Sequence, residues 1–157
     1  MWLPAQAARV WGVLGDAGRV REAITQAAQA REQVQPDDLD GLGGIMTFTL
    51  PRQLYYAADA KVWLPGEEHD AAAAAQEAIS AYEEADEAEQ SCSDEAGARA
   101  DLALVRIHLH DLDGAADALG DVLGVPPEYG RNGPVRCQNS CMASDRAFYP
   151  QHSCFYA

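Results

Sequence analysis

Basic residues are scarce in this chain of 157 residues, which has 11 Lys and Arg against 25 Asp and Glu and a formal net charge of −14. The phosphate backbone of a nucleic acid would be repelled by such a protein, and we expect no direct contact with nucleic acid. Aromatic residues are also few, at 8%, although hydrophobic residues reach 48% because alanine is abundant. Small apolar side chains in this proportion favour closely packed helices in a globular protein.

Long apolar runs are missing as well, and no stretch of about 18 apolar residues indicates a membrane span. The first residues have neither the basic start nor the apolar stretch of a secretory signal. Three of the four cysteines lie within the last 21 positions, unlike the evenly spaced cysteines of a disulfide-stapled secreted domain. We therefore expect a soluble, cytoplasmic protein with reduced thiols.

Motifs for catalysis are absent from the sequence. It has no nucleophile elbow, no phosphate-binding loop, no dinucleotide-binding glycine motif and no metalloprotease histidine pair. The carboxylates between Glu83 and Glu89 form a charge run, which is typical of a solvated face and not of a catalytic pair. We expect no enzymatic activity and no cofactor.

The apolar residues recur with the period of helices, and short connectors divide the predicted helices into three hairpins. A long connector, residues 35–50, follows the first hairpin. Ser91 or Ser93 is the expected start signal of the fifth helix, and Asp113 is the expected N-cap of the sixth. The predicted helices comprise residues 5–14, 17–34, 51–64, 67–85, 96–111 and 114–123. They form one domain, residues 1–127.

The three hairpins repeat one pattern when their turns are superimposed at Gly15, Gly66 and His110. The steps of about 51 and 44 residues exceed the roughly 34 of a tetratricopeptide (TPR) repeat because connectors are inserted. The segment from His110 to Pro127 resembles the second half of a TPR repeat. This resemblance implies an all-α, TPR-like right-handed stack of three helical hairpins, an α-solenoid. The positions that coincide are Val20, Ala71 and Ala115, then Ile24, Ala75 and Leu119, then Ala27, Ala78 and Val122.

A second resemblance rests on four segments that begin at Asp37, Gln53, Ala78 and Asp94. Their sequences are DDLDGLGGIMTF, QLYYAADA, AISAYE and DEAGARADLALVR. In this order they resemble the C-terminal helical-repeat region of actinobacterial Cro/C1-type (XRE family) transcriptional regulators. That family joins a helix-turn-helix DNA-binding domain to a TPR-like region for oligomerisation or signal reception. No helix-turn-helix pattern precedes Gly15, and the resemblance therefore implies a non-enzymatic sensing or docking module.

In a stack of helical hairpins, the first helix of each pair lines the concave side. We therefore expect a groove that binds a protein, a peptide or a small acidic ligand, because arginine and tyrosine are frequent in docking surfaces. Tyr55 and Tyr56 are adjacent, and one of them is expected to be core. A three-repeat array without a polar capping helix also exposes an apolar end, which predicts self-association. The expected groove residues are Arg52, Tyr55, Tyr56, Asp59, Arg99 and Arg106.

Residues 128–157 are expected to form an irregular tail, because they show no helical period. The tail is either native or the product of a shifted reading frame. Its Cys137, Cys141, His152 and Cys154 have the number of ligands that tetrahedral zinc takes, but their spacing favours an incidental cluster. A stand-alone TPR-like scaffold and a small Cys/His metal-binding protein are the alternatives to the regulator module.

Overall fold

The computed structural model describes residues 1–35 and 47–123, and these form six α-helices. The helices are α1 (Trp2–Val13), α2 (Ala17–Glu32), α3 (Leu50–Val62), α4 (Glu68–Glu84), α5 (Cys92–His108) and α6 (Leu112–Leu123). No strand occurs within the described residues, and the predicted all-α class is confirmed for them. The predicted tail, residues 128–157, lies outside the described part of the chain.

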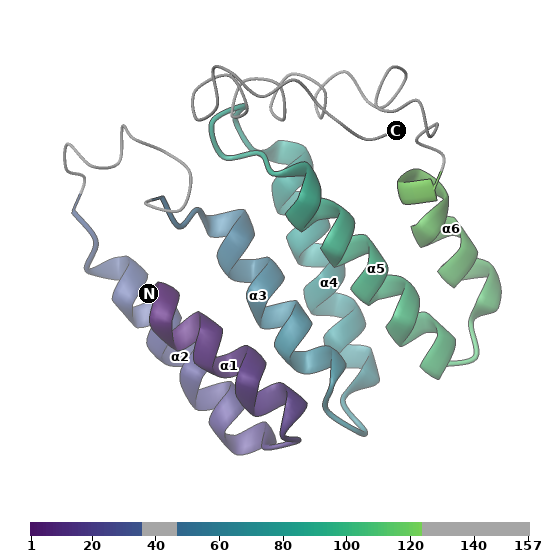
Figure 1. Ribbon diagram of the computed structural model, residues 1–157, viewed down its shortest axis with the longest axis horizontal. Coiled ribbons are helices and arrows are strands. Elements are labelled where there is room, and N and C mark those ends of the chain that lie inside the picture. Colours follow the sequence, from purple (N-terminus) through teal and green to yellow (C-terminus); the bar gives the residue numbers. More distant parts are fainter. Residues whose placement is uncertain (36–46, 124–157) are drawn as a thin grey trace, which may run out of the picture.

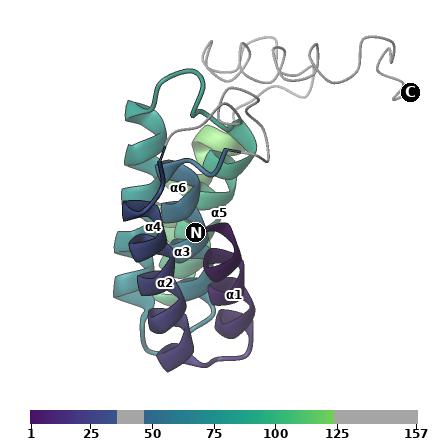
Figure 2. The same cartoon turned by 90° about the vertical axis from the view of Figure 1, so that its left-hand side faces the viewer.

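Consecutive helices pack as three hairpins, α1 with α2, α3 with α4, and α5 with α6 (Figure 1). The first helices of the hairpins lie side by side, because α1 contacts α3 and α3 contacts α5. In Figure 1, α2 lies behind α1, and α4 lies behind α3 and α5. Figure 2 shows α2 and α4 together on the side away from α1. The helices α1, α3 and α5 thus share one layer, which we call the α1–α3–α5 face.

The starts of α5 and α6 differ from the predicted ones, and a capping side chain explains each of these two differences. The Ser91 hydroxyl accepts a hydrogen bond from a backbone N–H of the first turn at 3.4 Å, so α5 begins at Cys92 and not at residue 96. The Asp111 carboxylate accepts from the Gly114 N–H at 3.0 Å, and Asp113 lies inside the first turn of α6. The predicted cap at Asp113 is therefore wrong. The remaining helix ends lie within three residues of the expected positions.

The three hairpin turns contain a left-handed residue at the positions that superimpose in the sequence. The φ angles are 71° at Gly15, 83° at Gly66 and 61° at His110. In the first and third turns, this residue donates to the carbonyl three positions back, and the next residue donates to the carbonyl five positions back. These paired bonds are those of a Schellman motif. The first and third turns therefore share a backbone conformation. The second turn shares only the positive φ, because the Gly66 N–H donates to Glu68 Oε1 at 3.0 Å.

The core is built mainly from small side chains. Val20, Ala71 and Ala115, the first aligned positions of the three second helices, are 0%, 1% and 4% exposed. Gly12 of α1 packs directly on the backbone of Ala60 in α3, where a Cβ atom would collide with the carbonyl group. Close helix approach thus depends on alanine and glycine. The largest buried cluster consists of Ala58, Ala74, Ala75, Ala78, Ile79, Ala98, Leu102, Ala103, Ala115 and Ala118.

Candidate functional site

Five polar and aromatic residues from three helices meet at the α1–α3–α5 face, and we call them the central cluster. Arg9 comes from α1, Tyr55, Tyr56 and Asp59 come from α3, and Asp101 comes from α5. The Arg9 Nε donates to Asp59 Oδ2, and the Arg9 guanidinium lies 4.7 Å from the centroid of the Tyr56 ring. The Tyr55 and Tyr56 rings meet edge to face at 5.6 Å. Aromatic and charged groups thus converge from all three hairpins.

The two adjacent tyrosines point to different neighbours. Tyr55 lies over Gly97 of α5, where a Cβ atom would come within 3.0 Å of a ring carbon. Tyr56 packs edge to face against Phe48, with 5.4 Å between the ring centroids. Both tyrosines are half-buried: Tyr55 packs against the largest core cluster, and Tyr56 packs against a smaller one that contains Phe48. The missing side chain at Gly97 is what admits Tyr55 between α3 and α5.

Asp101 carries a buried carboxyl oxygen, Oδ2, that has no hydrogen-bond partner within the described residues. Burial, followed by the charge of Asp59, raises the pKa of Asp101 to about 7, while Arg9 acts in the opposite direction. Burial and then Asp101 and Asp59 raise the pKa of Tyr55 to about 12. An unsatisfied buried carboxyl is unfavourable for folding. Asp101 is therefore a candidate functional residue.

The chemistry available to the central cluster is the binding of a basic group. When Asp101 is ionised, the carboxylates of Asp59 and Asp101 lie near the single guanidinium of Arg9, and the cluster has a net charge of −1. The tyrosine rings add faces that attract cations. Among the described residues, no group of three or more His, Cys, Asp or Glu could hold a metal ion.

Arg9 and Asp101 are the members of the central cluster that sequence reasoning missed. Asp101 follows Ala98 by three positions and precedes Val105 by four, so a carboxyl lies on the buried stripe of the fifth helix. Arg9 is the single charged residue of the first helix. A charge on an otherwise apolar helix face is the signal that could have identified both.

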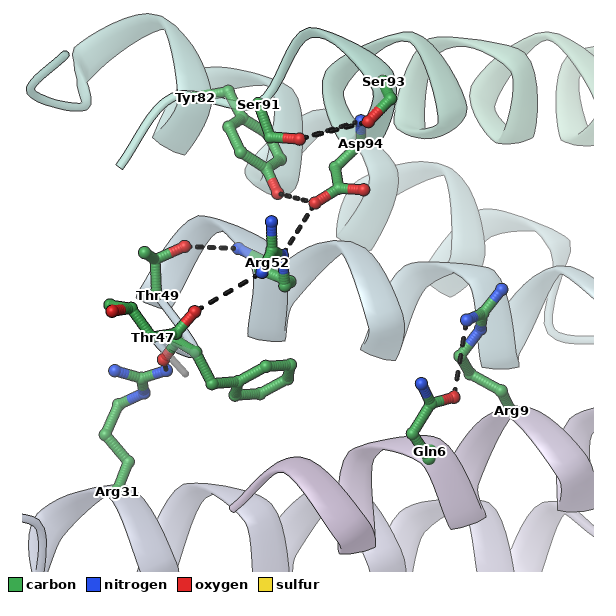
Figure 3. A network of polar contacts seen from close by, with 11 residues as sticks. Gln6, Arg9, Arg31, Thr47, Thr49, Arg52, Tyr82, Ser91, Ser93 and Asp94 are labelled. Atoms are coloured by element: carbon green, nitrogen blue, oxygen red, sulfur yellow. Dashed lines mark hydrogen bonds and ion pairs between the residues drawn. The ribbon is translucent and has the colours of Figure 1, made fainter. Parts of the chain in front are cut away.

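Arg52, the first predicted groove residue, belongs to a different network at the start of α3 (Figure 3). Its Nε donates to Asp94 Oδ2 at 2.8 Å, and its Nη1 donates to the Thr47 carbonyl at 3.4 Å. The Tyr82 hydroxyl donates to the same Asp94 oxygen at 3.3 Å. Burial and then the charge of Asp94 raise the pKa of Tyr82. Arg52 therefore links α3 to α5, and Asp94 in turn links α5 to Tyr82 of α4. In Figure 3, Arg9 lies apart from this network and beside Gln6, with 3.5 Å between Arg9 Nη1 and Gln6 Oε1.

Replacing Arg52 tests this structural role. The variant Arg52→Met keeps most of the apolar stem and removes the charge, leaving Asp94 in a partly buried site without its cation. We expect a loss of about 1–3 kcal/mol in the free energy of unfolding, measured by urea denaturation. The control Arg21→Met removes the exposed ion pair with Glu67, for which a loss of at most about 1 kcal/mol is expected. Equal losses in the two variants would contradict a structural role for Arg52.

Arg99 and Arg106 also lie in contacts outside the central cluster. Arg99 Nη2 lies 2.9 Å from Glu83 Oε1 and 2.9 Å from Glu95 Oε1, which ties α5 to the end of α4. Arg106 Nη1 donates to the Gly114 carbonyl at 2.6 Å, at the start of α6. The six predicted groove residues are therefore divided among several places. Only Tyr55, Tyr56 and Asp59 come together.

The possible zinc ligands Cys137, Cys141, His152 and Cys154 lie outside the described residues. Within those residues, no helix combines the length and the apolar character that crossing a membrane requires. No protein-family model, no curated protein and no solved structure matches this chain.

Proposed function

We propose that this chain is a TPR-like helical-repeat module that binds a partner through its α1–α3–α5 face and has no enzymatic activity. The observation that carries the proposal is the convergence of three helices on Asp101, whose buried Oδ2 has no hydrogen-bond partner within residues 1–35 and 47–123. Asp59 and Tyr55 lie near enough to interact with it electrostatically, and the Tyr56 ring packs edge to face against Tyr55. Groups that are unfavourable for folding but gathered on one face are typical of a binding site.

The matching hairpins support the repeat architecture. Gly15, Gly66 and His110 adopt the same left-handed conformation in the three turns, and the first helices lie next to one another. Successive hairpins that contact their neighbours are the building principle of helical-repeat proteins. In this proposal, the hairpins stack with a right-handed twist, and the central cluster lies on the ligand-binding side of the stack.

A basic peptide is the partner class that the charges favour. The chain has a formal net charge of −14, which attracts a basic segment from a distance. At short range, Arg9 already pairs with Asp59 and lies over the Tyr56 ring, so a bound Lys or Arg would pair with Asp101 and share the tyrosine rings with Arg9. A small acidic ligand is less favoured, because Arg52, Arg99 and Arg106 already contact carboxylates or carbonyls of the chain.

Peptide binding can be measured by fluorescence anisotropy with a labelled, lysine-rich peptide of about twelve residues. We expect wild-type protein to bind it, and Asp101→Asn and Tyr56→Leu each to weaken the affinity at least about fivefold, which corresponds to about 1 kcal/mol. The same peptide with glutamate in place of lysine should not bind. These variants remove one carboxylate and one aromatic face from the proposed site.

The matched control is Glu22→Gln, which removes one negative charge from the exposed side of α2. Its affinity should equal that of the wild type within about twofold, since long-range attraction between exposed charges is screened by salt. If Glu22→Gln weakens binding as much as Asp101→Asn, the attraction is a property of net charge and not of the central cluster. Absence of binding by the wild type would also contradict the proposal.

The wider role that we propose is that of the sensing or docking region of an XRE-type regulator. The support is the order of the four segments that resemble that family, together with the helical hairpins. The stand-alone scaffold is the competing function. A reading frame for a helix-turn-helix domain, continuous with this one or adjoining it, favours the regulator, whereas its absence from the locus favours the scaffold.

A further inference from the structure

The outer side of α1 is apolar and exposed. Leu3, Val10 and Val13 are 73%, 59% and 68% exposed, and Leu14, directly after the helix, is 66% exposed. Trp2 adds to this side with 47% of its surface exposed. At about 100° per residue, these five residues fall on one stripe of the helix, opposite the buried side. Gln6 is the one polar residue on this side of the helix. Five exposed apolar side chains on one helix side form a patch of the kind that marks an interaction surface.

The charges of the chain are distributed unevenly between its two ends. Residues 1–34 contain four arginines and three acidic residues, a net charge of +1. Residues 67–123 contain sixteen acidic residues and two arginines, a net charge of −14. The first helix itself has Arg9 and no acidic residue. The exposed apolar stripe therefore lies in the least acidic hairpin of the described residues.

We propose that the outer side of α1 binds the same surface of a second copy of this chain and forms a two-fold symmetric dimer. An isologous contact brings two identical apolar stripes together and leaves the acidic hairpins at opposite ends of the dimer. Any closer approach of the acidic hairpins would be opposed by like-charge repulsion. This charge distribution is the reason to assign the stripe to a second copy. The dimer does not depend on peptide binding by the central cluster, and each can fail without the other.

The size of α1 sets the expected strength of the dimer. A helix of 12 residues is about 18 Å long, and the paired surface is near or below the 1,200 Å² at which stable interfaces begin. We therefore expect a dissociation constant in the micromolar range.

Sedimentation equilibrium between about 1 and 500 µM tests the dimer. The wild-type chain should change from monomer to dimer in this range, and Leu3→Glu combined with Val10→Glu should raise the dissociation constant more than tenfold. Both residues are exposed, and circular dichroism should show unchanged helix content. The control is Leu112→Glu in α6, which is 66% exposed and should dimerise like the wild type. A wild type that stays monomeric, or a double variant that dimerises normally, would overturn the proposal.

Salt distinguishes this dimer from a head-to-tail assembly of the first hairpin on the acidic hairpins of another copy. Raising NaCl from about 50 to 500 mM should strengthen the proposed dimer, because salt screens the repulsion between two acidic chains. Head-to-tail contacts rely on attraction between opposite charges and should weaken. Association that falls with added salt, or that continues beyond the dimer, would exclude the symmetric arrangement.

Discussion

The difference in the free energy of unfolding between Asp101→Asn and the wild type should change in favour of the variant as the pH rises from about 4 to 8. The expected change over this range is about 1–3 kcal/mol. The folded-state pKa of Asp101 is raised to about 7, whereas an unfolded Asp titrates near 4. The wild-type protein must lose this proton at neutral pH while its carboxyl is buried, so it loses stability as the pH rises through this window. Asparagine does not titrate, and it resembles the protonated acid in shape. Urea denaturation followed by circular dichroism at several pH values measures the difference.

The control for this experiment is Asp117→Asn, at an exposed position of α6. The free energy of unfolding of this variant should differ little from that of the wild type, because an exposed side chain makes few contacts. A pH-independent difference for Asp101→Asn would show that the Asp101 carboxyl is ionised without penalty in the folded state. If Asp101→Asn is more stable than the wild type but binds the peptide more weakly, Asp101 contributes to binding at a cost in stability.

Gly12→Ala should reduce the free energy of unfolding by about 2–4 kcal/mol, although alanine is the better helix former. The added Cβ atom would meet the Ala60 carbonyl group, including its carbon at 3.0 Å. Because the obstacle is backbone and not a flexible side chain, α1 and α3 would have to move apart. The same contact positions Arg9 beside Asp59, so the variant should also lose peptide binding. Thermal and urea unfolding provide the stability measurement.

Gly120→Ala is the matched control for Gly12→Ala. Gly120 also lies inside a helix, but a Cβ atom there would meet nothing within 4 Å. We expect this variant to be more stable than the wild type by up to about 1 kcal/mol, from helix propensity alone. If Gly12→Ala is tolerated as well as Gly120→Ala, the close contact between α1 and α3 is not a determinant of the fold.

Local signals explain why the helices and turns could be predicted from the sequence. The apolar period, Pro51, and the glycines at 15 and 66 act within a few residues of the chain. His110 could be aligned with Gly15 and Gly66 because the residues around it repeat, although residues other than glycine are uncommon in the left-handed region. The start of α6 was misassigned because Asp111 and Asp113 are equally good caps, and only the backbone of the turn selects between them.

The composition of the central cluster could not be predicted, because it depends on contacts between distant segments. Arg9 and Asp59 are 50 positions apart, and Arg52 and Asp94 are 42 positions apart. Residue type predicts that an arginine in this acidic chain forms an ion pair, but it does not predict which Asp or Glu is the partner. Arg52 is therefore expected in the groove, but it pairs with Asp94 and joins α3 to α5. Asp101 was overlooked because its unusual burial results from the packing of α5 against α3.

The most direct test of the binding face is an NMR titration of the ¹⁵N-labelled chain with the lysine-rich peptide. We expect the backbone signals around Arg9, Tyr56 and Asp101 to shift together with a single affinity, and those on the exposed sides of α2 and α4 to stay in place. Shifts concentrated on α2 and α4, or no shifts at about millimolar peptide, would contradict the assignment of the α1–α3–α5 face as the binding surface.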